Sequence, residues 1–263
     1  MLKSFFVAFS MYSQIPVPRF TWNRDNMKYA ISFFPLVGVV IGALNFLLYY
    51  LFAVRGEYIS ASFFKGADLS LTTTCLGTAI PLIITGGIHL DGYMDTTDAL
   101  SSYGTKEKKL EILKDSHVGA FAVIGTILYY LIYVGTYSLV IRSKEAMAVV
   151  SLGFWFSRVL SAHGAVAFKY AKTSGMLYNF TSNMDKLPVQ ILIYVQLALS
   201  AVLMILASPA AGTAAILLNA AHLLLYQKRI YREFGGISGD TAGYFLTISE
   251  LLNIIGACIF CLV

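Results

Sequence analysis

Charged residues are scarce in this chain. Only 13% of its 263 residues are Asp, Glu, Lys or Arg, whereas 57% are hydrophobic. This balance excludes an ordinary soluble domain, in which about a quarter of the residues are charged. The basic residues border apolar runs and form no independent domain, so we expect no nucleic-acid partner.

Cysteine is also rare. Cys75, Cys258 and Cys261 all fall inside apolar runs. An odd number of cysteines in such positions indicates free thiols that serve as small apolar side chains. No redox-type sequence surrounds the C-x-x-C pair at 258–261, so a redox or metal role is not expected there.

The start of the sequence shows few features of a signal peptide. Residues 1–11 are apolar but lack a cationic segment, and they lead into Ile15-Pro16-Val17-Pro18. They fit an interfacial helix or a re-entrant segment better. The two prolines predict an extended turn after that segment.

Long hydrophobic runs dominate the rest of the chain. A helix needs about 20 apolar residues to cross a bilayer. Seven runs approach or exceed that length, at residues 28–54, 69–90, 117–141, 146–168, 187–207, 209–226 and 240–263. We therefore predict an all-α fold, a polytopic membrane helix bundle of about seven transmembrane spans, with residues 1–263 as one integral-membrane catalytic domain.

Two of these spans carry signals for a break or a turn. Pro81 and the pair Gly86-Gly87 predict breaks in the second span, which are tolerated at membrane depth where they line a cavity. Only Ser208 and Pro209 separate the fifth span from the sixth. This spacing predicts either a tight hairpin or a single broken element.

Basic residues are distributed unevenly between the two sides of the predicted bundle. The N-terminus and the second, fourth and sixth loops hold fourteen of them, the opposite side holds four, and Arg158 lies inside a span. The fourteen are Lys3, Arg19, Arg24, Lys28, Lys106, Lys108, Lys109, Lys114, Lys169, Lys172, Lys186, Lys228, Arg229 and Arg232. The positive-inside rule then predicts that the N-terminus and the even loops are cytoplasmic.

Three carboxylates crowd into residues 86–98, a stretch that follows a strongly apolar run. On a helix, Asp91, Asp95 and Asp98 occupy positions i, i+4 and i+7, within an arc of roughly 60°. Like charges on one face repel one another, and a divalent cation removes this repulsion. Such a cluster suits Mg²⁺, which substrate phosphates usually complete. The alternative is a solvated helix end rich in Asp.

Further candidates lie in loops on the same predicted side and in the fourth span. Asp115 and Asp240 each either cap a span or reach the metal site. The glycines of residues 235–239 precede a helix start, where backbone N–H groups favour an anion. Arg158 should face the bundle interior, either holding a phosphate or pairing with an acidic residue such as Glu250.

These motifs resemble the cobalamin synthase family (adenosylcobinamide-GDP ribazoletransferase). The resemblance is carried by His89-Leu90-Asp91-Gly92 with Asp95 and Asp98, by Lys114-Asp115-Ser116 with Gly119, by Gly235-Gly236 and Gly239-Asp240, and by the N-terminal Ile15-Pro16-Val17-Pro18. The motifs run in order over essentially the whole chain. Ala99 and His117 depart from the pattern, since the family usually has Gly and Arg there.

The resemblance implies a Mg²⁺-dependent transfer. Adenosylcobinamide-GDP would react with α-ribazole or its 5′-phosphate, forming adenosylcobalamin or its 5′-phosphate and releasing GMP. The family's setting is the bacterial cytoplasmic (inner) membrane, so the lipid bilayer is an expected partner. The active site would face the cytoplasm, and a homo-oligomer is compatible with this picture.

The expected chemistry assigns a role to each candidate. Mg²⁺ held by Asp91, Asp95 and Asp98 would stabilise the transferring phosphoryl group and the departing GMP. A carboxylate not tied to the metal, with Asp98 as first choice, would accept the hydroxyl proton. Asp115 and Asp240 are further candidate metal ligands. The expected substrate contacts are His89, Lys114, Arg158, Gly236 and Gly239.

Two alternatives compete with this interpretation. A CDP-alcohol phosphotransferase also uses an Asp cluster and Mg²⁺, but its pattern requires an Arg shortly after Asp-Gly, where this chain has Tyr93-Met94-Asp95. A secondary transporter would line its path with broken helices and with Arg158, His222 and Glu250. Against a transporter, the acidic cluster lies at one membrane face and no internal repeat is apparent.

Overall fold

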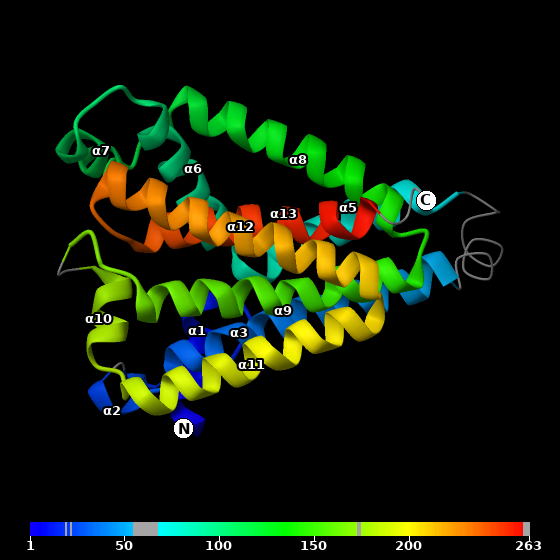
Figure 1. The fold of residues 1–263 in the computed structure, drawn as a ribbon, viewed down its shortest axis with the longest axis horizontal. Coiled ribbons are helices and arrows are strands. Elements are labelled where there is room, and N and C mark those ends of the chain that lie inside the picture. The colour runs from blue at the N-terminus through cyan, green and yellow to red at the C-terminus, as the bar shows by residue number, and fades with distance from the viewer. Residues whose placement is uncertain (19, 22, 55–67, 173–174, 260–263) are drawn as a thin grey trace.

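The computed structural model describes residues 1–18, 20–21, 23–54, 68–172 and 175–259, and within this part every regular element is a helix (Figure 1). The helices are α1 (Leu2–Tyr12), α2 (Arg24–Met27), α3 (Ala30–Tyr49), the π-helix η1 (Tyr50–Val54), α5 (Ser70–Thr85), α6 (Ile88–Ser101), α7 (Lys106–Ile112), α8 (Ala120–Val140), α9 (Lys144–Ala167), α10 (Met176–Ser182), α11 (Lys186–Ala207), α12 (Pro209–Phe234) and α13 (Gly239–Ile259). The all-α prediction is confirmed. Cys261 lies outside the described residues.

Six helices, α3, α8, α9, α11, α12 and α13, are long and apolar enough to cross a membrane. Helices α5 and α6 together make a seventh candidate, although the pair is bent by 92°. The prediction of a polytopic bundle with about seven spans is therefore confirmed. Residues 2–12 form a short apolar helix, α1, and residues 13–18 have no regular structure, in agreement with the turn predicted from the two prolines. The interfacial position of α1 stays a prediction.

The second predicted span ends earlier than expected. Helix α5 stops at Thr85, and Gly86 and Gly87 adopt left-handed φ angles of 64° and 79°, which only glycine reaches without strain. The break predicted at these glycines is confirmed. The break predicted near Pro81 is wrong, because Pro81 lies inside α5. Proline removes one backbone hydrogen bond, and the packed helices around α5 hold it in place despite that loss.

The fifth and sixth spans form the tight hairpin, since α11 and α12 are separate helices joined at Ser208. Gly212 packs directly on the backbone of Met204 across this hairpin. Helix α12 extends eight residues beyond the predicted end at residue 226. The apolar run ends there, but the more polar residues of the last two turns remain helical.

Helices α9 and α13 form the centre of the bundle. In their apolar windows 78% and 67% of the residues are buried, compared with 22% in α8 and α11 and 28% in α12. The outer faces of those three helices carry exposed large apolar side chains such as Leu131, Leu206 and Leu224. Because such faces have no partner among the described residues, lipid is the solvent that suits them.

Asparagines connect the spans at depth. The Asn219 amide donates to Asn253 Oδ1 (2.9 Å), and the Asn253 amide donates to the Gly153 carbonyl (2.9 Å), which links α12, α13 and α9. The Tyr137 hydroxyl donates to Asn45 Oδ1 (2.7 Å) between α8 and α3. Interhelical hydrogen bonds of this kind hold membrane helices together where lipid offers no partner.

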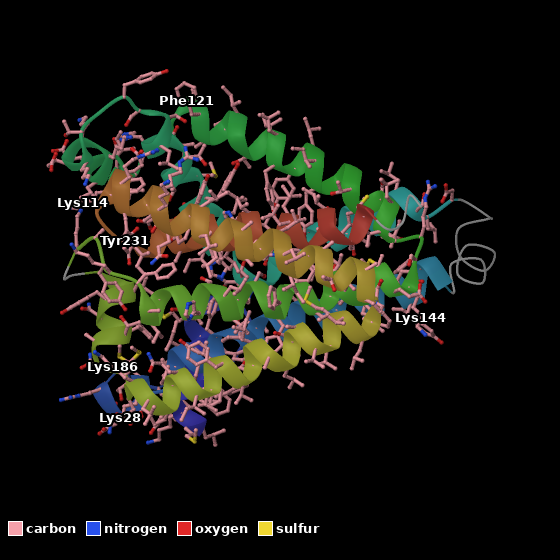
Figure 2. All side chains as sticks on the ribbon, in the orientation of Figure 1. Lys28, Lys114, Phe121, Lys144, Lys186 and Tyr231 are labelled. Atoms are coloured by element: carbon pink, nitrogen blue, oxygen red, sulfur yellow. The ribbon has the colours of Figure 1, made fainter. Side chains whose placement is uncertain are left out.

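The loops expected on one side of the membrane do share one end of the bundle. Figure 2 shows Lys28, Lys114 and Lys186 at one end, together with Tyr231, and Lys144 at the other. The side of the membrane that each end faces stays a prediction from the basic residues.

Candidate active site

Two glycines let α6 and α13 cross in backbone contact. A Cβ atom on Gly92 would lie 2.7 Å from the carbonyl oxygen of Asp240, and one on Gly243 would lie 2.9 Å from that of His89. Any larger residue would force the two helices apart. This crossing brings Asp91, on the first turn of α6, to the start of α13.

Three carboxylates meet at the crossing. The Asp95 carboxylate lies within electrostatic range of Asp91 and Asp240, and those two are also within range of each other. Asp91 is exposed, while Asp95 and Asp240 are half-buried. Their mutual repulsion is relieved when the group binds a proton or a cation.

Asp98 has a structural task at the other end of α6. Its two carboxylate oxygens accept hydrogen bonds from the backbone N–H groups of Gly119 (2.7 Å) and Ala122 (2.9 Å) at the start of α8. A carboxylate there satisfies free N–H groups and complements the positive end of the helix dipole. Asp98 therefore has fewer free lone pairs than Asp91 for a metal ion or a proton.

Asp115 lies apart from the other carboxylates, in the loop before α8. It is exposed, and its Oδ1 accepts a hydrogen bond from the His117 backbone N–H (3.0 Å) and contacts His117 Nδ1 (2.6 Å). These hydrogen bonds from His117 hold the pKa of Asp115 below its usual value. The structure does not bring Asp115 to Asp91, because its local turn directs it to solvent.

Arg158 is also outside the acidic cluster. Its side chain is buried in α9, where Nη1 lies 2.7 Å from Glu250 Oε1 and donates to the Phe154 carbonyl (2.9 Å). The structure thus supports the structural pairing with Glu250 rather than a phosphate contact. A buried guanidinium needs such a partner because desolvating an unpaired charge is costly.

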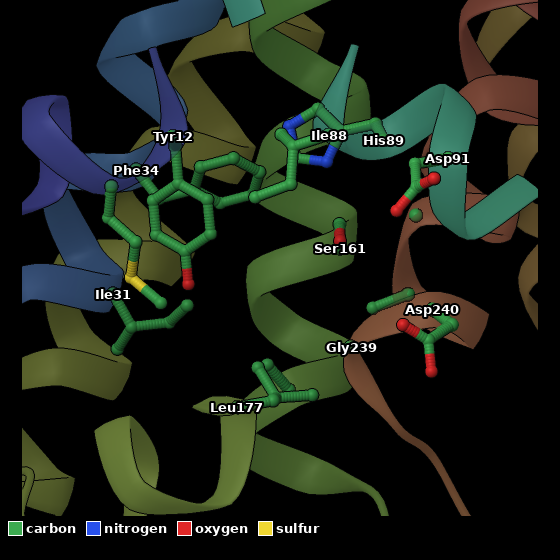
Figure 3. Close-up of a pocket in the computed structure, with 14 residues that line it drawn as sticks. Tyr12, Ile31, Phe34, Ile88, His89, Asp91, Ser161, Leu177, Gly239 and Asp240 are labelled. Atoms are coloured by element: carbon green, nitrogen blue, oxygen red, sulfur yellow. The ribbon is translucent and has the colours of Figure 1, made fainter. Parts of the chain in front are cut away.

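An apolar chamber of about 340 Å³ opens beside the crossing. It is lined by Met11, Tyr12, Ile31, Phe34, Ile88, His89, Asp91, Ser161, Ala165, Leu177, Gly239, Asp240, Ala242 and Gly243. Figure 3 shows the Tyr12 and Phe34 rings on one side of it and the two carboxylates of Asp91 and Asp240 on the other. His89, on the first turn of α6, lines this chamber together with Asp91 and Asp240.

A second cavity of about 250 Å³, the lysine chamber, adjoins the first. Its lining is Leu110, Leu113, Lys114, Tyr170, Ala171, Lys172, Gly175, Leu177, Tyr178, Ile237, Ser238, Gly239 and Asp240. Leu177, Gly239 and Asp240 belong to both chambers. Asp240 therefore stands at the junction of an apolar space and a space with lysines, and Asp91 lines the apolar space.

Two lysines face each other in the lysine chamber. Lys172 and Lys114 both line this chamber, within electrostatic range of each other and with Asp240 within range of Lys172, and neither lysine forms an ion pair with another described residue. Burial and the neighbouring Lys114 ammonium lower the pKa of Lys172. Two ammonium groups that line one chamber without an ion-pair partner among the described residues favour a bound anion. Lys114 was a predicted substrate contact, whereas the sequence indicated no role for Lys172 at the site.

The glycines before α13 divide into two kinds. Gly236 packs against the backbone of residues 169–171, where Ile237 pairs with Tyr170 and accepts a hydrogen bond from Ala171 N–H (2.9 Å). Its small size is therefore needed for loop packing. Gly239 has open space around it and lines both chambers, so it remains able to approach a ligand.

The donor set at the junction fits Mg²⁺ that shares its coordination with a substrate. Among the described residues, no three Asp, Glu, His or Cys side chains converge closely enough to hold a metal ion by themselves. Mg²⁺ commonly takes one or two carboxylates and completes its shell with water and phosphate oxygens. Asp240 offers such a carboxylate in the lysine chamber, with Asp91 and Asp95 within electrostatic range of it.

The close crossing gives a testable prediction. Gly92→Ala is expected to lower kcat about a hundredfold, because its Cβ would displace the Asp240 backbone and a shift of about 1 Å at a reacting group has a cost of that size. Gly135→Ala in α8 is the matched control, since nothing lies within 4 Å of its Cβ position. Steady-state turnover of the purified variants checks this prediction, and equal rates would show that the contact does not set the geometry of the site.

Comparison with known proteins agrees with the resemblance in the sequence. A profile of the family described as cobalamin-5-phosphate synthase matches residues 4–258. An adenosylcobinamide-GDP ribazoletransferase of Lachnoclostridium phytofermentans is 41% identical, over 95% of this chain and 91% of the relative. Proteins of the same name from Clostridium botulinum (strain Alaska E43) and Fusobacterium nucleatum are 33% and 30% identical and match 99% and 96% of this chain, and 98% and 96% of their own lengths. No solved structure matches.

The fold is that of a polytopic helical membrane protein, and the names of its relatives mark it as a transferase. The chain belongs to the cobalamin-5-phosphate synthase family. The family resemblance of the sequence motifs is thereby confirmed, and neither the CDP-alcohol phosphotransferase nor the transporter alternative is needed.

Proposed function

We propose that this chain joins adenosylcobinamide-GDP to α-ribazole or its 5′-phosphate and releases GMP, with Mg²⁺ as cofactor. The new P–O bond forms between the acceptor ribose oxygen and the phosphoryl group that carries the corrinoid. The diphosphate bond to GMP breaks. The names of the relatives support these substrates.

One observation carries the proposal. Asp240 lines both chambers, Asp91 lines the apolar one, and Asp95 lies within electrostatic range of both, while Lys114 and Lys172 line the other chamber. Acidic groups for a hard cation and basic groups for an anion occur together where a metal–diphosphate complex is handled.

The carboxylates and the lysines of the site have separate roles in this proposal. One or two of the carboxylates of Asp91, Asp95 and Asp240 would hold Mg²⁺ together with substrate oxygens, and the bound cation would supply charge neutralisation at the diphosphate. Lys114 and Lys172 bind diphosphate oxygens and keep them in the lysine chamber. A carboxylate of the cluster that is free of the cation accepts the proton of the ribose hydroxyl as the hydroxyl attacks.

We place the site at the cytoplasmic face of the bacterial inner membrane. The loops that carry Lys114 and Lys186 lie at the same end of the bundle, where the basic residues gather. The positive-inside rule assigns that end to the cytoplasm, and nucleotide-linked substrates are supplied there.

A single assay tests the function. Detergent-purified protein is incubated with Mg²⁺, adenosylcobinamide-GDP and α-ribazole, and GMP is quantified. GMP release is expected only with both substrates, and a chelator is expected to stop it until Mg²⁺ is restored. Release that needs no acceptor, or that continues in chelator, would contradict the proposal.

The pH dependence of donor binding follows from Lys172. Its pKa is lowered by burial and by Lys114, so the side chain loses its charge as pH rises, at a pH below the usual 10.5. The KM for the GDP-linked donor is therefore expected to rise at alkaline pH in the wild type. Lys172→Arg keeps its charge throughout, so its KM profile is expected to be flatter. Identical profiles would exclude Lys172 from donor binding.

A further inference from the structure

We propose that the apolar chamber binds the benzimidazole base of the ribazole acceptor. The inference rests on the proposed function and adds to it a division of the site, with the acceptor's base in the apolar chamber and the diphosphate of the donor in the lysine chamber. α-Ribazole is a ribonucleoside whose base is a flat bicyclic ring with two methyl groups.

The wall of the chamber suits a flat apolar ring. The ring centroids of Tyr12 and Phe34 lie 4.4 Å apart, and those of Phe34 and His89 lie 5.6 Å apart, so three rings gather on the chamber wall. Ile31 and Leu177 add aliphatic surface to the lining. Aromatic side chains bind planar ligands by stacking and by edge contacts.

The size of the chamber limits its occupant. A volume of about 340 Å³ lies at the lower end of the range of small-ligand pockets. A bicyclic base fits such a space, whereas the corrin macrocycle with its amide side chains does not. Guanine is small enough, but most of its polar edge would face apolar side chains, which is costly for unpaired groups.

Ser161 supplies a free hydrogen-bond donor inside the chamber. Its side chain is only 7% exposed, yet its hydroxyl makes no hydrogen bond to any described residue. Ser157, one turn earlier on α9, shows the usual arrangement and donates to the Gly153 carbonyl (2.8 Å). A benzimidazole riboside keeps one unsubstituted ring nitrogen, an acceptor to which the Ser161 hydroxyl can donate.

The geometry of the two chambers also places the ribose. Asp91 and Asp240 lie at the edge of the apolar chamber, and Asp240 and Gly239 are shared with the lysine chamber. A nucleoside whose base enters the apolar chamber leaves its ribose at this junction. The attacking hydroxyl then lies beside the carboxylates and faces the diphosphate, which is the arrangement that in-line transfer requires.

The test compares two serines of the same helix. Ser161→Ala is expected to raise the KM for α-ribazole about tenfold, which is the upper range for losing one neutral hydrogen bond. The KM for adenosylcobinamide-GDP should stay unchanged. Ser157→Ala, which removes a hydroxyl outside the chamber, is the control and should alter neither KM. Ala165→Leu, which fills the chamber, should raise the KM for α-ribazole more strongly than Ser161→Ala.

Direct binding separates this inference from the reaction itself. Calorimetric titration of the purified wild type with dimethylbenzimidazole is expected to show about tenfold tighter binding than with unmethylated benzimidazole, because the two methyl groups become buried. Ala165→Leu should abolish binding of both. Binding of the base by a protein that releases no GMP would overturn the proposed reaction but support the chamber assignment. A KM rise for the GDP-linked donor alone in Ser161→Ala and Ala165→Leu would overturn the chamber assignment.

Discussion

Asp91→Asn and Asp95→Asn are each expected to lower the rate of transfer severely while leaving the bundle folded. Both side chains reach water, so neither substitution leaves a buried charge without a partner. An amide carries no charge for a cation and binds no proton from the acceptor hydroxyl. Losing one preorganised charged group of this kind typically lowers kcat by a factor of about 10²–10³.

The measurement is GMP release by detergent-purified variants with matched thermal unfolding curves. Asp25→Asn is the control, because Asp25 is an exposed carboxylate in α2 that pairs with Lys28 at 3.1 Å, away from both chambers. Full activity is expected for this control. Turnover retained by Asp91→Asn or by Asp95→Asn would remove that residue from the mechanism.

Arg158→Leu is expected to destabilise the bundle by about 3–5 kcal/mol, the usual cost of leaving one member of a buried ion pair alone. Its partner Glu250 is only 8% exposed and lies deep between α9 and α13. Thermal or denaturant unfolding in detergent measures the loss.

A double substitution distinguishes structure from chemistry at this pair. Arg158→Leu combined with Glu250→Leu removes both charges, so most of the lost stability should return. The double variant should also keep the KM for the GDP-linked donor, since Arg158 does not line the chambers at the acidic cluster. A large rise in that KM, with stability restored, would return Arg158 to the substrate-binding residues.

The fold could be predicted well because hydrophobic length alone sets it. A run of about 20 apolar residues has few options other than a transmembrane helix. The predictions failed where tertiary packing determines whether a helix continues. At Pro81, the neighbouring helices keep the residue inside α5. The end of α12 was predicted too early because polarity ends an apolar run without ending a helix.

The site was predicted in part. The spacing of Asp91 and Asp95 and the motif at Asp240 have local signals, and the structure brings these residues together. Lys172 and Ser161 have none, because a lone Lys in a loop or a lone Ser in an apolar span resembles many others. Their importance comes from the neighbours that tertiary packing gives them, such as Lys114 beside Lys172.

The same limit explains why two of the predicted aspartates have other partners in the structure. Asp98 fits the i, i+7 pattern of the acidic face, yet it binds the start of α8, an element that the pattern does not describe. Asp115 follows Lys114 in the motif, but a turn to His117 fixes it at the surface. Spacing along the chain predicted which face carries acidic groups and left open which partner each would meet.

The apolar chamber is built from both ends of the chain. Met11 and Tyr12 come from α1, whereas Gly239 and Ala242 come from α13. During synthesis, the first wall leaves the ribosome long before the second one exists. The acceptor pocket therefore becomes complete only when α13 has been inserted, so a chain that stalls in translation or is cut before α13 cannot carry a partial activity.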